Sequence, residues 1–182
     1  LSALSAEQLT SLSTTQIQAV GATWISSLGQ AQTAALTTEQ VAALTIAQIK
    51  GLTAADVGDI PLAGLAVLAA TQIAALTFAA AKGLLEDQLA ALTTTQVAGL
   101  TIAITQALTA TQVAALSATQ MAALTTTALT GLTAASIGSL SQTQLAALTT
   151  NQIKCLTVAQ IKGLTADQMP LLATTQVAAL SA

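Results

Sequence analysis

The sequence has 182 residues and a net charge of −3, and it is 53% hydrophobic, 6% charged and 1% aromatic. Its four basic residues are lysines, so the chain has no basic surface of the kind that nucleic-acid binding needs. It contains no histidine and one cysteine, Cys155, which excludes a disulfide framework, a His-ligated zinc site and a Cys-His nucleophile. We expect Cys155 to pack as a small residue, and we expect no metal site and no cofactor.

An eight-residue repeat runs from Leu4 to Ala179 without insertion or deletion, which gives 22 octads. The first position is Leu in 20 octads, the second is Ser or Thr in 16, the fifth is Gln in 15, and the sixth is aliphatic or Met in 19. Ser/Thr-x-x-Gln is the pattern of a helix capping box, and the apolar first and sixth positions are those of a hydrophobic staple. The repeat therefore predicts a short α-helix at positions three to eight of every octad, followed by a turn.

In chain order, the predicted helices begin with 6–11, and the first irregular stretch is 20–35. Gly21 and Gly29 stand there at capping positions, and Trp24 stands where Gln is usual. An isolated Trp in a chain without Tyr is a candidate ligand patch. The alternative is that Trp24 packs locally at the edge of the regular array.

From residue 36 onward capping boxes recur along the rest of the chain. The pairs that we take as structural caps are Thr37 with Gln40, Thr45 with Gln48, Thr93 with Gln96, Thr109 with Gln112, Thr149 with Gln152, and Thr157 with Gln160. Two prolines interrupt the pattern: Pro61 occupies a capping position, where its ring sets the start of the helix, and Pro170 is expected to shorten its helix.

Residues 60–81 form an uncharged stretch that is long enough to span a bilayer. The octad pattern continues through it in register, so we expect no membrane span. Glu86 and Asp87 are adjacent carboxylates, but the chain offers no His, Arg or Tyr to support them in acid–base catalysis. We therefore predict that the protein is not an enzyme, with no catalytic, cofactor-binding or metal residues.

Alternate octads differ in composition. All seven acids lie in odd-numbered octads, where most are placed to stabilise helix N-termini, and the glycines at the eighth position lie in even-numbered ones: Gly51, Gly83, Gly99, Gly131 and Gly163. Helices this short need neighbours to stack on, because they are unstable alone in water. The alternation favours an all-α solenoid with two octads per coil and with the glycine helices as its tightly packed side. Three octads per coil is the alternative.

The segments LTTEQVAALTIAQIKGLTAADV and LTTNQIKCLTVAQIKGLTADQM resemble the LTxxQIxAL octapeptide arrays of very long secreted or surface proteins of Gram-negative bacteria. Those proteins carry labels such as adhesin-like and hemolysin-like. The resemblance covers almost the whole chain, and it implies an extracellular or bacterial cell-surface location. It supplies no catalytic residues.

We thus expect residues 1–182 to be one octapeptide-repeat solenoid, cut from a longer array. The expected function is that of a structural stalk, spacer or self-assembling filament element, with end-to-end self-association through uncapped ends. The alternative is a binding solenoid that presents one face to a protein, glycan or surface ligand, through the variable third and fourth positions of the octads.

Overall fold

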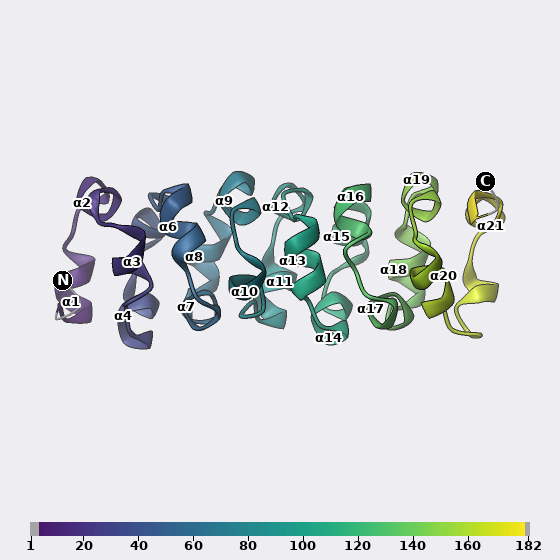
Figure 1. The fold of residues 1–182 in the computed structure, drawn as a ribbon, viewed down its shortest axis with the longest axis horizontal. Coiled ribbons are helices and arrows are strands. Elements are labelled where there is room, and N and C mark those ends of the chain that lie inside the picture. The colour runs from purple at the N-terminus through teal and green to yellow at the C-terminus, as the bar shows by residue number, and fades with distance from the viewer. Residues whose placement is uncertain (1–3, 181–182) are drawn as a thin grey trace.

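The computed structural model describes residues 4–180, and these residues form an elongated stack of short helices with no strands. Figure 1 shows the two termini at opposite ends of the stack. The elements are α1 (Ala6–Thr10), α2 (Thr14–Ala19), α3 (Ala22–Ile25), α4 (Gln30–Ala35), α5 (Thr38–Ala42), α6 (Ile46–Gly51), α7 (Ala54–Asp59), α8 (Leu62–Ala66), α9 (Ala70–Ala74), α10 (Phe78–Ala81), α11 (Glu86–Ala91), α12 (Thr94–Ala98), α13 (Ile102–Ala107), α14 (Ala110–Ala114), α15 (Ala118–Ala123), α16 (Thr126–Leu129), α17 (Ala134–Gly138), α18 (Gln142–Ala147), α19 (Thr150–Lys154), α20 (Val158–Gly163), the 3₁₀ helix η1 (Met169–Leu171) and α21 (Thr174–Leu180). The prediction of an all-α solenoid is confirmed.

Each octad starts and ends its own helix by local bonds. In α20, the Thr157 hydroxyl accepts a hydrogen bond from the Gln160 backbone N–H, and the Gln160 amide oxygen accepts one from the Thr157 N–H. At the other end, the Leu164 N–H donates to the Ile161 carbonyl while Leu164 itself is extended. The extended first-position residue thus turns the chain into the next helix.

One coil of the solenoid contains three octads. The close helix contacts in the described chain all join elements three octads apart, such as α3 with α6, α12 with α15, and α17 with α20. The helices therefore form three parallel rows: α1, α4, α7, α10, α13, α16, α19 and α21; α2, α5, α8, α11, α14, α17 and α20; and α3, α6, α9, α12, α15, α18 and η1. Our preference for two octads per coil is wrong, and the 22 octads make seven coils and one further octad rather than 11 coils.

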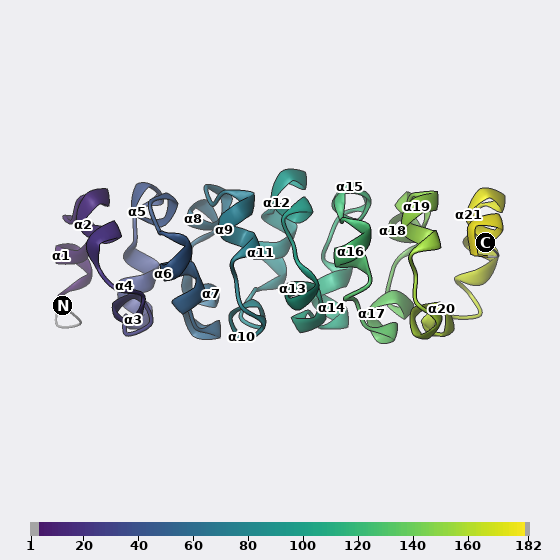
Figure 2. The same ribbon diagram turned by 45° about the horizontal axis from the view of Figure 1, so that its top comes forward.

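The core is a single column along the axis of the rod. Most of its residues come from the first and sixth positions of the octads, and they belong to one continuous cluster. Leu89 and Leu145 at sixth positions are fully buried, and Leu92 and Leu148 at first positions are nearly so. Figure 2 shows how successive coils stack without a break between them. Three short helices per coil enclose this column on three sides, which explains why the chain needs so few aromatic side chains to fill it.

The eighth-position glycines mark close contacts between coils. A Cβ added to Gly99 would lie 2.6 Å from the Ala70 carbonyl oxygen, and a Cβ on Gly83 would overlap the Ala54 carbonyl. The prediction that these helices pack tightly is confirmed. The glycine octads are spread over all three rows, so their alternation along the sequence does not mark one side of the solenoid.

The two prolines act at helix ends. Pro61 is the N-cap of α8, and Pro170 lies in η1, the one octad of the described chain with a 3₁₀ helix in place of an α-helix. Pro170 has no N–H to donate back to the preceding turn, which explains the loss of the α-helix there. Residues 60–81 are divided among α8, α9 and α10, and within residues 4–180 no helix has the length and apolarity to span a membrane.

Candidate functional site: the glutamine ladder between coils

The six predicted cap pairs all form capping boxes in the structure. In Thr93 and Gln96, for example, the Gln96 N–H lies 3.2 Å from the Thr93 hydroxyl oxygen, and the Thr93 N–H lies 2.9 Å from Gln96 Oε1. The amide oxygen of the glutamine is thus occupied within its own octad. Its Nε2 group remains available for a different contact.

That Nε2 group binds the preceding coil. Gln96 Nε2 donates to the carbonyls of Leu65 and Leu68, each at 2.9 Å, which lie 31 and 28 residues earlier. Gln160 repeats this contact with Leu129 and Leu132 at 2.8 Å. The glutamines with both of these bonds are Gln40, Gln48, Gln88, Gln96, Gln120, Gln144, Gln152, Gln160, Gln168 and Gln176. We call this series of bonds the glutamine ladder.

The ladder has a clear energetic role. Carbonyls at the C-terminus of a short helix lack partners within the helix, and an unpaired buried carbonyl costs free energy. Each ladder glutamine supplies two donors to the turn of the coil below, and its own buried amide is fully hydrogen-bonded as a result. The ladder side chains are nearly excluded from solvent; Gln48, for example, is 1% exposed.

The sequence contains a signal for the ladder that our capping interpretation missed. A glutamate would serve a capping box as well as a glutamine does, yet the fifth position carries 15 glutamines and no glutamate. Of these two side chains, only the glutamine amide can accept from its own cap and donate to another coil at the same time. The strict preference for Gln therefore indicates a donor role as well as a cap.

The ladder is interrupted over four successive helices of one row. The fifth positions of α7, α10, α13 and α16 hold Asp56, Ala80, Ile104 and Ala128. Asp56 is 4% exposed and accepts from the N–H and hydroxyl of Thr53, but a carboxylate cannot donate to the coil below. Glycines allow direct helix packing in this row, since Gly83 in the α10 octad lies against α7.

Trp24 also stands at a fifth position, in α3. It is half-buried against the core, and no described residue accepts a hydrogen bond from its buried Nε1. The structure thus places Trp24 in the register of the ladder, within the first coil. Its role as a ligand patch stays a prediction.

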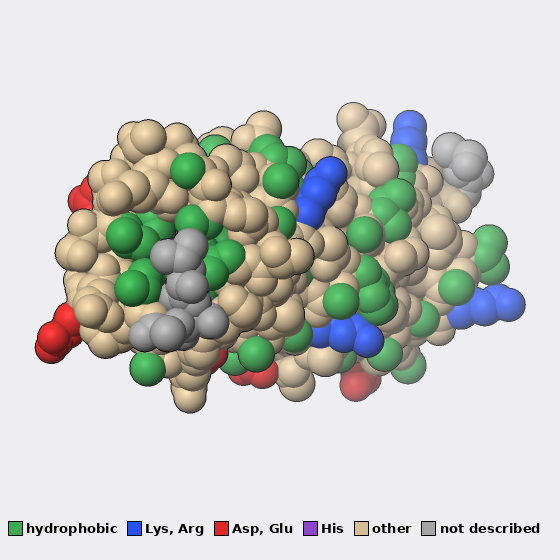
Figure 3. Space-filling model, turned by 60° about the vertical axis from the view of Figure 1, so that its left-hand side comes forward, with side chains coloured by type: hydrophobic (Ala, Val, Ile, Leu, Met, Phe, Trp, Pro, Cys, Tyr) green, Lys and Arg blue, Asp and Glu red, His purple; other side chains and the backbone are tan. Residues whose placement is uncertain are grey.

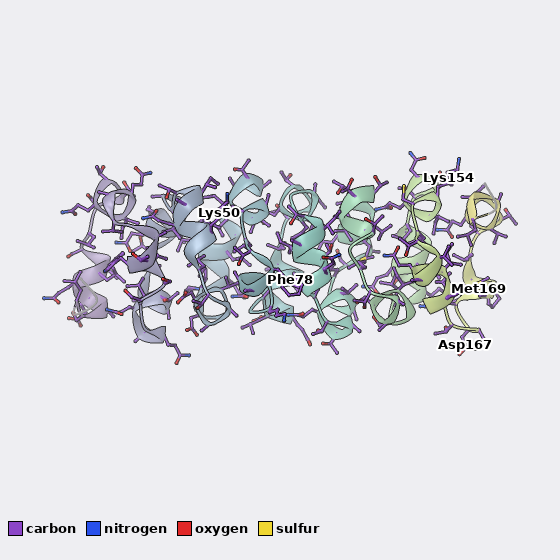
Figure 4. The ribbon with its side chains drawn as sticks, in the orientation of Figure 1. Lys50, Phe78, Lys154, Asp167 and Met169 are labelled. Carbon is purple, nitrogen blue, oxygen red and sulfur yellow. The ribbon has the colours of Figure 1, made fainter. Side chains whose placement is uncertain are left out.

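Charged side chains other than the buried Asp56 are scattered over the outside of the rod. Figure 4 shows Lys154 and Asp167 at opposite edges of the molecule near its C-terminal end.

The pKa of Glu39, in the first turn of α5, is lowered from 4.5 by a hydrogen bond from its own backbone N–H and by the Thr37 and Thr38 hydroxyls. Within residues 4–180, no three His, Cys, Asp or Glu side chains are grouped so that they could hold a metal ion.

One groove on the surface has mixed character. It has a volume of ≈ 490 Å³ and lies between the start of α11 and the start of α14, with Leu84, Leu85, Glu86 and Asp87 among its lining residues. Lys82 also lines it, and the Lys82 Nζ lies 4.8 Å from the centre of the Phe78 ring.

The single cysteine does not behave as expected. Cys155 is exposed at the C-terminal cap of α19, so our expectation that it packs as a small residue is wrong. Other eighth-position residues such as Ala107 and Ala179 are buried, but the coils around Cys155 do not cover it.

Comparison with known proteins adds no name to this architecture: no protein-family model matches the sequence, and no curated protein matches it.

Proposed function

We propose that the chain is a non-enzymatic structural spacer, a rod whose length is set by the number of octads. The observation that carries this proposal is the glutamine ladder, in which ten glutamines along the rod bind the coil before their own by the same pair of bonds. Hydroxyl groups at the second position and glutamine amides at the fifth position are committed to caps and to the ladder. Polar side chains used in this way build length and stiffness.

The resemblance to octapeptide arrays of very long secreted proteins supports a location outside the cell or on a bacterial cell surface. In that setting a rod of uniform coils would hold a terminal domain away from the membrane. The repeat then serves as a stalk, and its sequence is free to vary at outward positions while the caps, the ladder and the core are kept.

The experiment inserts a second copy of residues 140–163 after Gly163. These three octads all carry ladder glutamines, so the inserted Gln144 meets the same carbonyls, Ile137 and Leu140, that Gln168 meets in the native chain. We expect a folded rod that is longer by one coil, about 8–10 Å by the usual spacing of packed helices. Small-angle X-ray scattering measures the length and circular dichroism measures the unfolding transition.

The control inserts a copy of residues 140–159, which amounts to two and a half octads and is therefore out of phase with the repeat. This insertion displaces every later glutamine from its carbonyls, and we expect a lower melting temperature. An insertion of three octads that unfolds the protein, or an out-of-phase insertion that does no harm, would contradict the spacer proposal.

A binding solenoid is the second candidate. It is favoured by exposed apolar residues at the third octad position in two neighbouring helices, α10 and α13. Phe78 is 45% exposed and Ile102 is 38% exposed, and the two helices pack against each other. Thr is common at this position, so Phe78→Thr with Ile102→Thr should leave the rod folded. The native chain and the variant would each be used to select peptides from a displayed library. Peptides that the native chain enriches and the variant does not would support binding at this surface, and equal enrichment by both would contradict it.

A further inference from the structure

One octad in the middle of the rod departs from the repeat in a way that the fold does not need. It is the octad of α11, residues 84–91, which reads LLEDQLAA. Leu85 stands at the second position, where Ser or Thr is usual, and α11 therefore starts without a side-chain hydrogen bond from its N-cap residue. Leu85 is 49% exposed, so it adds little to the core in return. A position that breaks a local rule without a structural gain is where a function should be sought.

The same octad concentrates negative charge. Glu86 and Asp87 are the only adjacent acids in the sequence, and both side chains are exposed. Figure 3 shows charged side chains as separate patches on a largely uncharged surface. Asp87 Oδ1 accepts a hydrogen bond from the Gln88 N–H at 2.8 Å, whereas the Glu86 carboxylate receives none from the described residues. The pair therefore offers negative charge that the described chain does not neutralise.

These residues line the groove between the starts of α11 and α14. Residues 84–87 line it from one octad, and Thr109, Thr111 and Gln112 line it from the other. Its volume of ≈ 490 Å³ is within the usual range of ligand-binding pockets. Lys82 lines it as well, but its ammonium group lies over a neighbouring aromatic ring. The groove thus combines an exposed leucine with two carboxylates.

A buried donor at the groove also indicates a ligand. Gln112 is 8% exposed, and its Oε1 accepts from the Thr109 N–H at 2.7 Å, as in the other capping boxes. Its Nε2 donates to the Leu84 carbonyl, 28 residues earlier, but not to the Ala81 carbonyl, which is the second acceptor that a ladder glutamine would use. One amide hydrogen is therefore without an acceptor among residues 4–180, which costs free energy. Since Gln112 lines the groove, a ligand there can supply that acceptor.

We propose that this groove binds a segment of a partner protein in which an apolar side chain stands next to Lys or Arg. The inference narrows the binding role that is the second candidate function above, and it does not depend on the spacer role. In the complex, a backbone carbonyl of the segment accepts from Gln112 Nε2, the apolar side chain covers Leu85, and the cationic group pairs with Glu86 and Asp87. A polypeptide supplies all three groups together. The two carboxylates would repel the phosphates of a nucleic acid.

The experiment is an NMR titration of the isotope-labelled native chain, in which the side-chain amide of Gln112 reports on the groove. The probe is the tetrapeptide Ala-Leu-Arg-Ala with both termini capped, and the comparison is Ala-Leu-Glu-Ala, which reverses its charge. We expect the first peptide to shift the Gln112 amide and the Leu85 backbone, and the second to bind at least about ten-fold more weakly. The affinity for the first peptide should fall as salt is added.

Two variants separate the apolar contact from the charges. Leu85→Thr supplies the usual cap residue, so the melting temperature should not fall, while the affinity for Ala-Leu-Arg-Ala drops at least about five-fold. Glu86→Gln with Asp87→Asn removes both charges, keeps a side-chain acceptor at the helix start, and should weaken binding at least about ten-fold. Glu7→Gln with Glu39→Gln removes two acids from the first turns of α1 and α5, and this matched control should bind as the native chain does.

The proposal is overturned if neither peptide shifts the Gln112 amide, if both bind equally, or if the charge-removal variant binds as well as the control. Shifts that grow with protein concentration alone would overturn it by assigning the groove to a second copy of the chain. Shifts with a neutral glucose tetrasaccharide and not with the peptide would assign it to a sugar. None of these results decides the binding test at Phe78 and Ile102, whose substitution leaves the groove acids in place, and none bears on the length of the rod.

Discussion

Two threonines occupy core positions of the array, and their hydroxyl groups differ in what they contact. Thr33 is 2% exposed in α4, and its buried Oγ1 has no hydrogen-bond partner. Thr105 is fully buried in α13, and its Oγ1 lies 2.7 Å from the Ala128 carbonyl of the next coil. Both stand at a sixth position, where aliphatic residues are the rule.

We expect Thr33→Val to raise the free energy of unfolding by about 1 kcal/mol, because it removes a buried hydroxyl that bonds to nothing and keeps the shape of the side chain. Thr105→Val should lower it by about 1–2 kcal/mol, since the same change deletes a hydrogen bond between coils. Urea denaturation of the two variants measures both values. Changes of the same sign in the two variants would contradict the assignment of one free hydroxyl and one bonded hydroxyl.

At the scale of the helix, stability depends on neighbours rather than on the segment itself. The α-helices are four to seven residues long, far below the length at which an isolated helix persists in water. Caps fix where each one starts, and the adjacent coils supply the packing that holds it. Each helix is therefore stable only when it packs closely on the helices of the adjacent coils. The glycines at the eighth position allow this close packing, so substitutions there test it.

We expect Gly83→Ala to destabilise the protein by about 2 kcal/mol or more, because the new Cβ would overlap the Ala54 backbone and force α10 away from α7. Gly21→Ala is the control, since its Cβ would meet nothing closer than the Thr23 hydroxyl at 3.8 Å; we expect a change of less than about 1 kcal/mol. Thermal unfolding of both variants gives the comparison. Equal losses would mean that glycine matters here only through backbone freedom.

At the scale of the whole molecule, what the sequence predicts and what it leaves out have physical causes. Helix starts are predictable because a capping box such as Thr157 with Gln160 is local, and core positions follow from the apolar first and sixth places. The number of octads per coil is not local, since it depends on which helices meet across a full turn of the solenoid. The composition of the octads alternates with a period of two, and we interpreted that period as one coil. The contacts between helices instead have a period of three octads.

The candidate site divides in the same way. The cap role of Gln96 is visible within a single octad of sequence, whereas its bonds to Leu65 and Leu68 join positions more than one coil apart. The preference for Gln over Glu at the fifth position pointed to a donor but not to its acceptors. Knowledge of the coil length is needed before a ladder can be drawn.

The three-octad coil gives a rod whose length can be checked in solution. Seven coils and one octad, at about 8–10 Å per coil, make a rod roughly 60–75 Å long with a radius of gyration of about 20–24 Å. Eleven coils of two octads would give about 90–110 Å and a radius of gyration of roughly 30 Å by the same spacing, and a compact globule of this size would give about 16 Å. Scattering should be measured over a concentration series and extrapolated to zero concentration, so that association does not add to the length. We expect a radius of gyration within the range for seven coils. A radius as large as that of the eleven-coil rod would restore the two-octad coil, and one as small as that of the globule would mean that the octads fold back on themselves and that the molecule cannot act as a spacer.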